Sequence, residues 1–143
     1  MRMRHVRAMM MFLVAMTLVA AAPPPQPRAW LGVGVSLHRS SDGEVFLHVE
    51  NVAPKGPGAT AGVEPLDIIT ALDGKKVAFR NEVEFLRYVA SLEPGRAIRL
   101  RIRRADKALN LKLIPGELTP AAREVWLATY RAAEAKAARA AKQ

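Results

Sequence analysis

Cysteine is absent from this sequence, and aromatic residues make up only 6% of it. Without a thiol the chain can form no disulfide framework, thiolate zinc site, cysteine nucleophile or lipid-acylated cysteine. Acidic residues are also scarce, since 13 Asp+Glu stand against 22 Lys+Arg and leave a formal net charge of +9. A length of 143 residues suits one domain, and a 50% share of hydrophobic residues excludes a wholly disordered chain.

Catalytic and metal-binding side chains are also few. After the first 22 residues the only histidines are His38 and His48, and the G-x-S-x-G nucleophile elbow does not occur. A Ser-His-Asp triad needs a base that a third group orients. A two-residue turn at Asp42-Gly43 would pair His38 with Leu47 and put the two histidines on opposite faces of a hairpin. We therefore expect no enzyme, no metal site and no cofactor.

The long uncharged run of the chain lies at its start. Residues 8–22 form a run of 15, which is shorter than the roughly 20 residues that a membrane-spanning helix needs. Three arginines precede this run: Arg2, Arg4 and Arg7. The pattern is typical of a secretory signal peptide, residues 1–21, so we expect cleavage after Ala21 and a periplasmic or secreted protein of charge +6 (19 − 13). An uncleaved segment that anchors the protein in the inner membrane is the alternative.

The remaining chain is predicted to hold one small α+β domain between two extensions. Residues 22–28 form a Pro-rich linker, residues 29–117 the domain, and residues 118–143 an Ala-rich basic helix. Within the domain, period-two alternation predicts five to six short strands, while Asn81 starts a main helix and Gly62 ends a short one. We expect a partly open β-barrel with these two helices, followed by the C-terminal helix.

The C-terminal helix has its own start signal and an apolar stripe. Thr119 can cap it, and Pro120 suits its first position. Trp126 and Tyr130 share the stripe with Ala122, Ala133 and Ala137. The stripe either packs on the domain or binds a partner.

Four stretches follow one another at a characteristic spacing. They are Trp30–Val33 (WLGV), Val52 with residues 55–63 (KGPGATAGV), residues 66–77 (LDIITALDGKKV), and the helix from Asn81 to the Pro94-Gly95 turn. Together they resemble a PDZ domain in its bacterial HtrA-type arrangement, from Ala29 to Pro115. The resemblance implies the PDZ fold. Because nothing outside this segment could form a protease domain, we expect the PDZ domain to stand alone.

Two positions depart from the family pattern. Leu66 stands where the family has glycine, and a positive φ would strain a leucine there. Gly58 stands where the family has alanine, which we expect to loosen the short helix.

The resemblance also implies a groove that binds the C-terminus of a peptide. Leu31, Gly32 and Val33 match the loop whose backbone N–H groups receive the terminal carboxylate, an anion nest that the glycine leaves open. The peptide would then add as an extra strand to the edge formed by residues 33–37.

The helix that follows Asn81 would form the second wall of this groove. The positions that match groove sites are Glu82, Leu86 and Val89, opposite Leu31, Val33 and Val35. This aliphatic pocket predicts a ligand with a hydrophobic last residue, while Glu82 predicts a basic or hydroxyl-bearing residue two places earlier. Ordinary core packing is the other interpretation of the apolar members.

A basic hairpin is the second candidate site. It carries Arg96, Arg99, Arg101, Arg103, Arg104, Lys107 and Lys112. Such a face attracts phosphates, but no aromatic residue is interleaved for base stacking, so we expect no nucleic-acid partner. The face is either a solvated strand surface or a contact for anionic lipid head groups or an acidic partner through Arg99, Arg101, Arg103 and Lys112.

These features predict a non-catalytic module of the cell envelope that binds hydrophobic C-termini or extended strands by β-augmentation. We expect it to act as an adaptor or scaffold, with a protease or secretion component as a candidate partner. The alternative function is binding to an anionic surface, including peripheral contact with a membrane.

Overall fold

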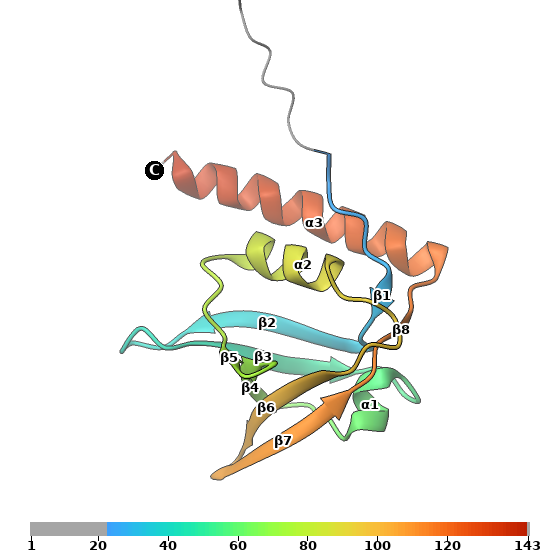
Figure 1. Ribbon diagram of the computed structural model, residues 1–143. Coiled ribbons are helices and arrows are strands. Elements are labelled where there is room, and N and C mark those ends of the chain that lie inside the picture. Colours follow the sequence, from blue (N-terminus) through green and yellow to red (C-terminus); the bar gives the residue numbers. More distant parts are fainter. Residues whose placement is uncertain (1–22, 143) are drawn as a thin grey trace, which may run out of the picture.

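The computed structural model describes residues 23–142 of the chain (Figure 1). The predicted signal peptide and its cleavage after Ala21 lie outside these residues. The elements are β1 (Ala29–Trp30), β2 (Val33–Arg39), β3 (Val45–Val52), α1 (Pro57–Ala61), β4 (Ile68–Leu72), β5 (Lys75–Lys76), α2 (Glu82–Ala90), β6 (Ile98–Arg104), β7 (Lys107–Leu113), β8 (Gly116–Glu117) and α3 (Pro120–Ala141). None of the helices in residues 23–142 combines the length and hydropathy that a bilayer-spanning helix requires.

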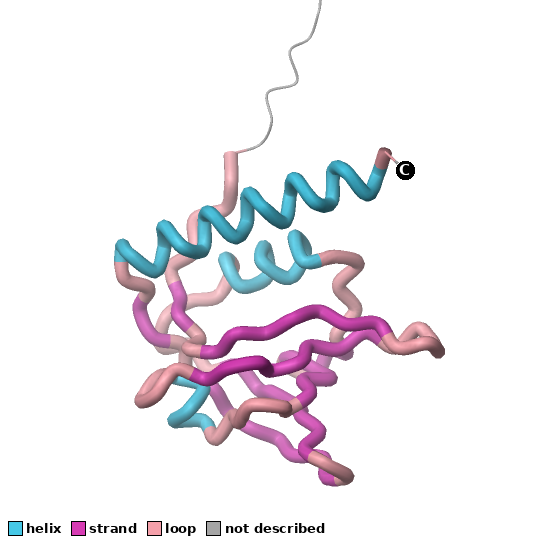
Figure 2. The backbone as a smooth tube through the Cα atoms, turned by 180° about the vertical axis from the view of Figure 1, so that it is seen from behind, coloured by secondary structure: helices cyan, strands magenta, loops and turns pink. Residues whose placement is uncertain are grey.

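Six strands form one antiparallel sheet in which β2 is an edge strand. The order is β2-β3-β4-β6-β7, with β5 paired to β4, and β1 and β8 form a separate two-stranded ribbon. α2 lies beside β2, and α3 runs along the outer side of α2 (Figures 1 and 2). The predicted α+β class with a main, a short and a C-terminal helix is confirmed, and the sheet of the described residues remains open.

The core lies between the sheet and α2. Leu47, Val49 and Ile102 are at most 1% exposed, and Ile98 and Leu100 on β6 are also buried. The arginines between them are exposed, or partly so at the end of the strand, because successive side chains of a strand point to opposite faces. Since burial of one aliphatic side chain contributes about 1.5–3 kcal/mol, this alternation determines which face of the sheet α2 covers.

The β2–β3 hairpin is longer than predicted. Its loop spans residues 40–44, and the Ser40 N–H donates to the Glu44 carbonyl at 2.8 Å. His38 therefore pairs with Phe46, and its ring centroid lies 5.8 Å from that of His48. The predicted placement of the histidines on opposite faces is wrong, because a register shift of one residue reverses the face. Among residues 23–142 no group of three or more His, Asp or Glu side chains is placed to hold a metal ion.

The short helix α1 ends at the predicted residue, and Leu66 in the following loop adopts the positive φ expected at a position where the family has glycine. Gly62 ends the helix in the left-handed conformation, with φ 93°. Leu66 adopts φ 75° and is 77% exposed, so the leucine carries the strain expected of this position and gains almost no apolar burial in return.

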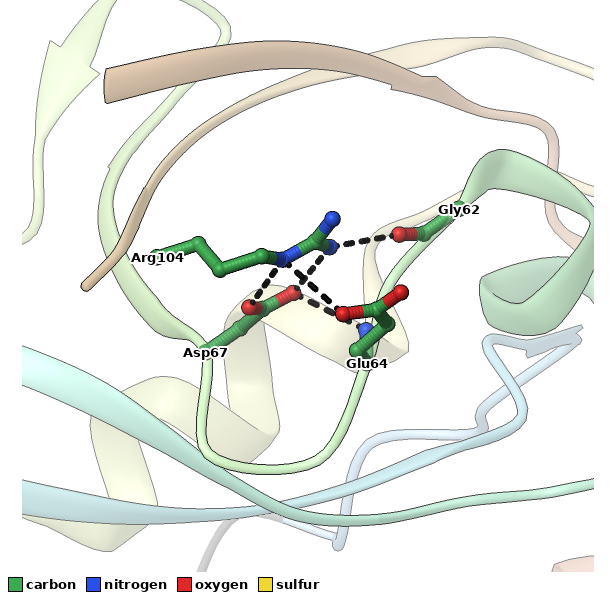
Figure 3. Close-up of polar contacts among 4 residues, drawn as sticks. All are labelled: Gly62, Glu64, Asp67 and Arg104. Atoms are coloured by element: carbon green, nitrogen blue, oxygen red, sulfur yellow. Dashed lines mark hydrogen bonds and ion pairs between the residues drawn. The ribbon is translucent and has the colours of Figure 1, made fainter. Parts of the chain in front are cut away.

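An ion pair joins the loop after α1 to the end of β6 (Figure 3). Arg104 Nε and Nη2 donate to the two carboxylate oxygens of Asp67 at 2.9 and 2.8 Å, and Asp67 is only 1% exposed. The same Nη2 donates to the Gly62 carbonyl at 2.7 Å, and Nε lies 3.2 Å from a Glu64 carboxylate oxygen. Arg104 thus does not belong to the exposed basic hairpin, because it shares the inward face of β6 with Ile102.

Loss of Arg104 should destabilise the domain, because it leaves the Asp67 carboxylate buried without its counter-charge. We expect Arg104→Ala to lower the free energy of unfolding in urea titrations at neutral pH by clearly more than a typical surface substitution does. Arg103→Ala, the matched change at an exposed neighbour, should alter it by less than about 0.5 kcal/mol. Equal effects of the two substitutions would contradict a structural role for the ion pair.

The ion pair should also make stability depend on pH. Burial is the largest single influence and raises the pKa of Asp67, but the hydrogen bonds from Arg104 and the Glu64 N–H and the charge of Arg104 together hold it below its ordinary value. Because the folded-state pKa is the lower one, the ionised carboxylate stabilises the fold above about pH 3.9, the ordinary value. This contribution is lost as the pH falls through the folded-state pKa. The stability difference between wild type and Arg104→Ala should therefore shrink below about pH 4.

Candidate functional site

The loop between β1 and β2 is shaped by Gly32. Its φ of 68° is one that side chains rarely adopt, and a Cβ on this residue would lie 3.0 Å from Pro57 Cδ. Glycine is therefore required here by the backbone and by the contact with α1, in addition to the open approach that the sequence suggests.

The carbonyl groups of this loop are turned into the protein. The Leu31 carbonyl accepts from the Gly58 N–H at 2.9 Å, and the Gly32 carbonyl accepts from the Ala53 N–H at 2.8 Å. Within residues 23–142, the N–H groups of Leu31 and Gly32 donate to no protein acceptor. Successive unpaired amides with their carbonyls held elsewhere form a concavity that attracts an anion.

The free edge of β2 continues from this loop. The Gly32 carbonyl bonds across to β3 at one end of the strand, and the Ser40 N–H does so at the other. Since hydrogen-bonded and non-hydrogen-bonded residues alternate in an antiparallel pair, the backbone N–H and C=O groups of Val33, Val35 and Leu37 point away from β3. The irregularity opposite Gly34 and Val35 lies in β3 and leaves this alternation intact. The Val33 amide thus joins the two amides of the loop.

α2 stands opposite this edge. Its N-terminus is capped as predicted, since the Asn81 side chain accepts from the Glu84 N–H at 3.1 Å. Glu82 is exposed, whereas Leu86 and Val89 are only 7% and 8% exposed. Leu86 leaves little apolar surface free because a further element packs against it.

That element is α3, which packs along α2 (Figure 2). Tyr130, at 0% exposure, and Ala133 form a second apolar cluster with Leu86. Arg87 Nε donates to the Tyr130 hydroxyl at 3.0 Å, and the Trp126 ring stacks on Tyr130 with centroids 5.3 Å apart. Of the two interpretations of the apolar stripe, packing on the domain is therefore confirmed.

One cavity brings all the predicted groove residues together. It measures about 460 Å³, and its lining includes Leu31, Gly32, Val33, Val35, Glu82, Leu86 and Val89. Trp126 and Thr129 of α3 line the same space. The amphipathic stripe was the available sequence signal for these α3 residues, but it does not say against which surface the helix packs. We call this space the near cavity.

A second cavity continues along β2. It measures about 500 Å³, and its lining includes Val35 and Leu37 from β2 and Glu82 from α2. On the α3 side it is lined by Ala133, Lys136, Ala137 and Ala140. This far cavity shares Val35 and Glu82 with the near cavity, so the two spaces meet at these residues.

The basic face lies on the outer side of the sheet. Arg99, Arg101, Arg103 and Lys112 are all exposed, and Arg99 lies directly opposite Lys112 in the β6–β7 register. Among residues 23–142, none of the four forms an ion pair. Like charges directly opposite one another are destabilising, so this face attracts counter-ions.

Comparison with known proteins identifies the family. Residues 29–114 match the PDZ domain, which is more than half of the chain. The chain therefore belongs to the PDZ domain family, and the matched region is a protein- or peptide-binding module.

Two curated relatives share this region. The magnetosome formation protease MamE of Paramagnetospirillum magneticum is 31% identical over 99 residues, which are 69% of this chain and 12% of that protein. The serine endoprotease DegS of Escherichia coli K12 is 32% identical over 93 residues, 60% of this chain and 26% of that protein. The chain thus spans about a quarter or less of these relatives, and the aligned part is their non-catalytic PDZ portion.

Solved structures agree with the assignment. The HtrA-type protease AlgW with a decapeptide has a TM-score of 0.53 at 26% identity, covering 65% of this chain and 30% of that one. The HtrA3 PDZ domain bound to a phage-derived ligand has a TM-score of 0.51 at 20% identity, covering 62% of this chain and 86% of that one, and shares the fold.

The departure at Gly58 can be tested directly. A Cβ at this position would lie 2.3 Å from Val33 Cγ1, and a β-branched side chain has little freedom to move. Gly58→Ala should therefore lower the free energy of unfolding by about 1–3 kcal/mol in urea titrations, despite the better helix propensity of alanine. Thr60→Ala, an exposed change on the same helix, is the control. A more stable Gly58→Ala variant would mean that the glycine merely loosens α1, as the sequence suggested.

Proposed function

We propose that this protein binds extended peptides with a free C-terminus and an apolar last residue, which add as a strand to β2. The observation that carries this proposal is the run of unpaired amides at Leu31, Gly32 and Val33, which stands at the head of a free strand edge. The near cavity opens beside these amides and is lined mainly by apolar side chains.

The chemistry of the site suits such a ligand. A terminal carboxylate accepts several hydrogen bonds, and the three amides supply them without a competing carbonyl. The outward groups of Val35 and Leu37 continue the ladder and bind backbone independently of ligand sequence. The aliphatic walls formed by Val33, Leu86 and Val89 favour Val, Leu, Ile, Ala or Phe at the last position. Glu82, exposed where the two cavities meet, favours a basic or hydroxyl-bearing residue two places earlier.

We also propose an exported, non-catalytic role as adaptor or scaffold in the envelope. The N-terminal sequence pattern supports export, and the match of the chain to the PDZ part of proteases supports a binding role without catalysis. A protease or secretion component is the partner class that fits such an adaptor, and no cofactor is needed for this chemistry.

Labelled octapeptides that differ only in the last residue test the groove. We expect dissociation constants of order 10 µM for Val, Leu or Phe, and at least tenfold weaker binding for Asp or Lys, in fluorescence anisotropy. Amidation of the terminal carboxyl should abolish binding, because it removes the anion. Equal binding of acid and amide forms would refute the carboxylate site.

N-methylation of the peptide backbone separates strand addition from other modes of binding. In an added strand, alternate residues turn their N–H groups to the partner edge. Of two consecutive peptide residues, N-methylation should abolish binding at the one whose N–H faces β2. N-methylation of the other residue should be tolerated. Similar losses at both positions would contradict β-augmentation.

Binding to anionic membranes through the basic face is a second candidate function. The unpaired charges and the direct opposition of Arg99 and Lys112 favour it. We expect co-sedimentation with phosphatidylglycerol vesicles that weakens as salt rises, because the interaction is electrostatic. Charge reversal of Arg99, Arg101 and Arg103 to Glu should remove it, while Arg28→Glu, an exposed arginine outside this face, serves as the control. No binding at low salt would end this candidate.

A further inference from the structure

We propose that α3 is a third wall of the peptide groove, so that a bound strand lies between β2, α2 and α3. This inference rests on the proposed peptide-binding function. It adds an element that lies beyond the residues matched to the family, 29–114. In this arrangement α3 limits the length and side-chain size of the ligands that the groove accepts.

The two cavities trace the path of such a ligand. They meet at Val35 and Glu82 and together follow the free edge of β2 from Leu31 to Leu37. Their volumes of about 460 and 500 Å³ lie within the range of about 300–1,000 Å³ that is usual for ligand sites. The space is therefore already present between the helices and the strand edge, with α3 docked.

α3 follows this path in register with β2. Trp126 and Thr129 line the near cavity beside Val33, whereas Ala133 and Ala137 line the far cavity beside Leu37. β2 and α3 thus run in the same direction (Figure 1). A ligand strand antiparallel to β2 would pass the alanines of α3 first and end with its carboxylate at the β1–β2 loop.

The side chains of α3 explain how the helix is held without filling the groove. Tyr130 fastens it to α2 through Leu86 and Arg87, so the largest buried side chain of α3 packs against the helix rather than the strand edge. Alanine ends at Cβ, and Ala133 and Ala137 therefore leave room beside β2 that a longer aliphatic side chain would occupy.

The near and far cavities then have different roles. The last residues of the ligand contact Trp126 together with the aliphatic walls of β2 and α2. The upstream residues pass beneath the alanine face, where Glu50, Glu82 and Lys136 are the charged groups. A tripeptide needs only the near cavity, while an octapeptide needs both.

Ala137→Leu tests the third wall because it narrows the far cavity alone. The probes are the tightest octapeptide of the series above and the tripeptide of its last three residues. We expect Ala137→Leu to weaken octapeptide binding about tenfold or more and to leave tripeptide binding unchanged. Ala138→Leu is the matched control, because this neighbouring alanine is exposed and lines neither cavity. Circular dichroism and thermal unfolding should show that both variants remain folded.

A second variant shows whether α3 contributes to peptide binding or competes with the peptide for the groove. Tyr130→Ala removes the side chain that fastens α3, so a third wall predicts weaker octapeptide binding. Tighter binding would show that α3 competes with the ligand and would overturn the proposal, as would equal octapeptide affinity in Ala137→Leu and Ala138→Leu. If wild type binds no peptide of either length, the groove itself fails and the third wall with it.

Discussion

The ion pair between Asp67 and Arg104 is the interaction on which the binding surface depends. It holds the loop after α1 against β6, and Arg104 also binds the Gly62 carbonyl at the end of that helix. α1 in turn supplies the Gly58 N–H and the Pro57 ring against which the β1–β2 loop is set. The direction of the unpaired amides at Leu31 and Gly32 is therefore determined by contacts that reach across the sheet.

The free edge of β2 can bind a ligand, but it also exposes the protein to unwanted pairing with strands of other chains. Unpaired N–H and C=O groups along an edge strand are a template for pairing with any other strand. In this protein α2 and α3 lie on the side of the sheet next to β2 (Figure 2). The near and far cavities follow the edge between these elements. A single extended peptide can thus still pair with β2, while the two helices hinder the approach of a whole β-sheet from another molecule.

Local patterns predicted much of this fold. Alternation located the strands, Asn81 and Thr119 were recognised as caps, and the order of four short motifs indicated a PDZ domain. Six of the seven groove residues could be proposed because they belong to those motifs, and Val35 because it continues the strand that follows the first motif. All seven line one cavity. The hairpin register and the inward position of Arg104 were missed, since loop length and the last residue of a strand are weakly encoded by periodicity.

By itself, the sequence determined the elements, the family, and the residue types available at the groove, because helix caps, glycine turns and strand alternation act over a few residues. Tertiary structure alone decided that α3 lies along α2 and faces the β2 edge. The apolar stripe of α3 fits any complementary surface. The packing of Tyr130 and Ala133 against Leu86, over 40 residues away in the chain, and the hydrogen bond from Arg87 to Tyr130 select this one. Tertiary structure also explains Gly58. A side chain at this position would collide with Val33 across the loop, and this constraint cannot be read from the sequence of α1 itself.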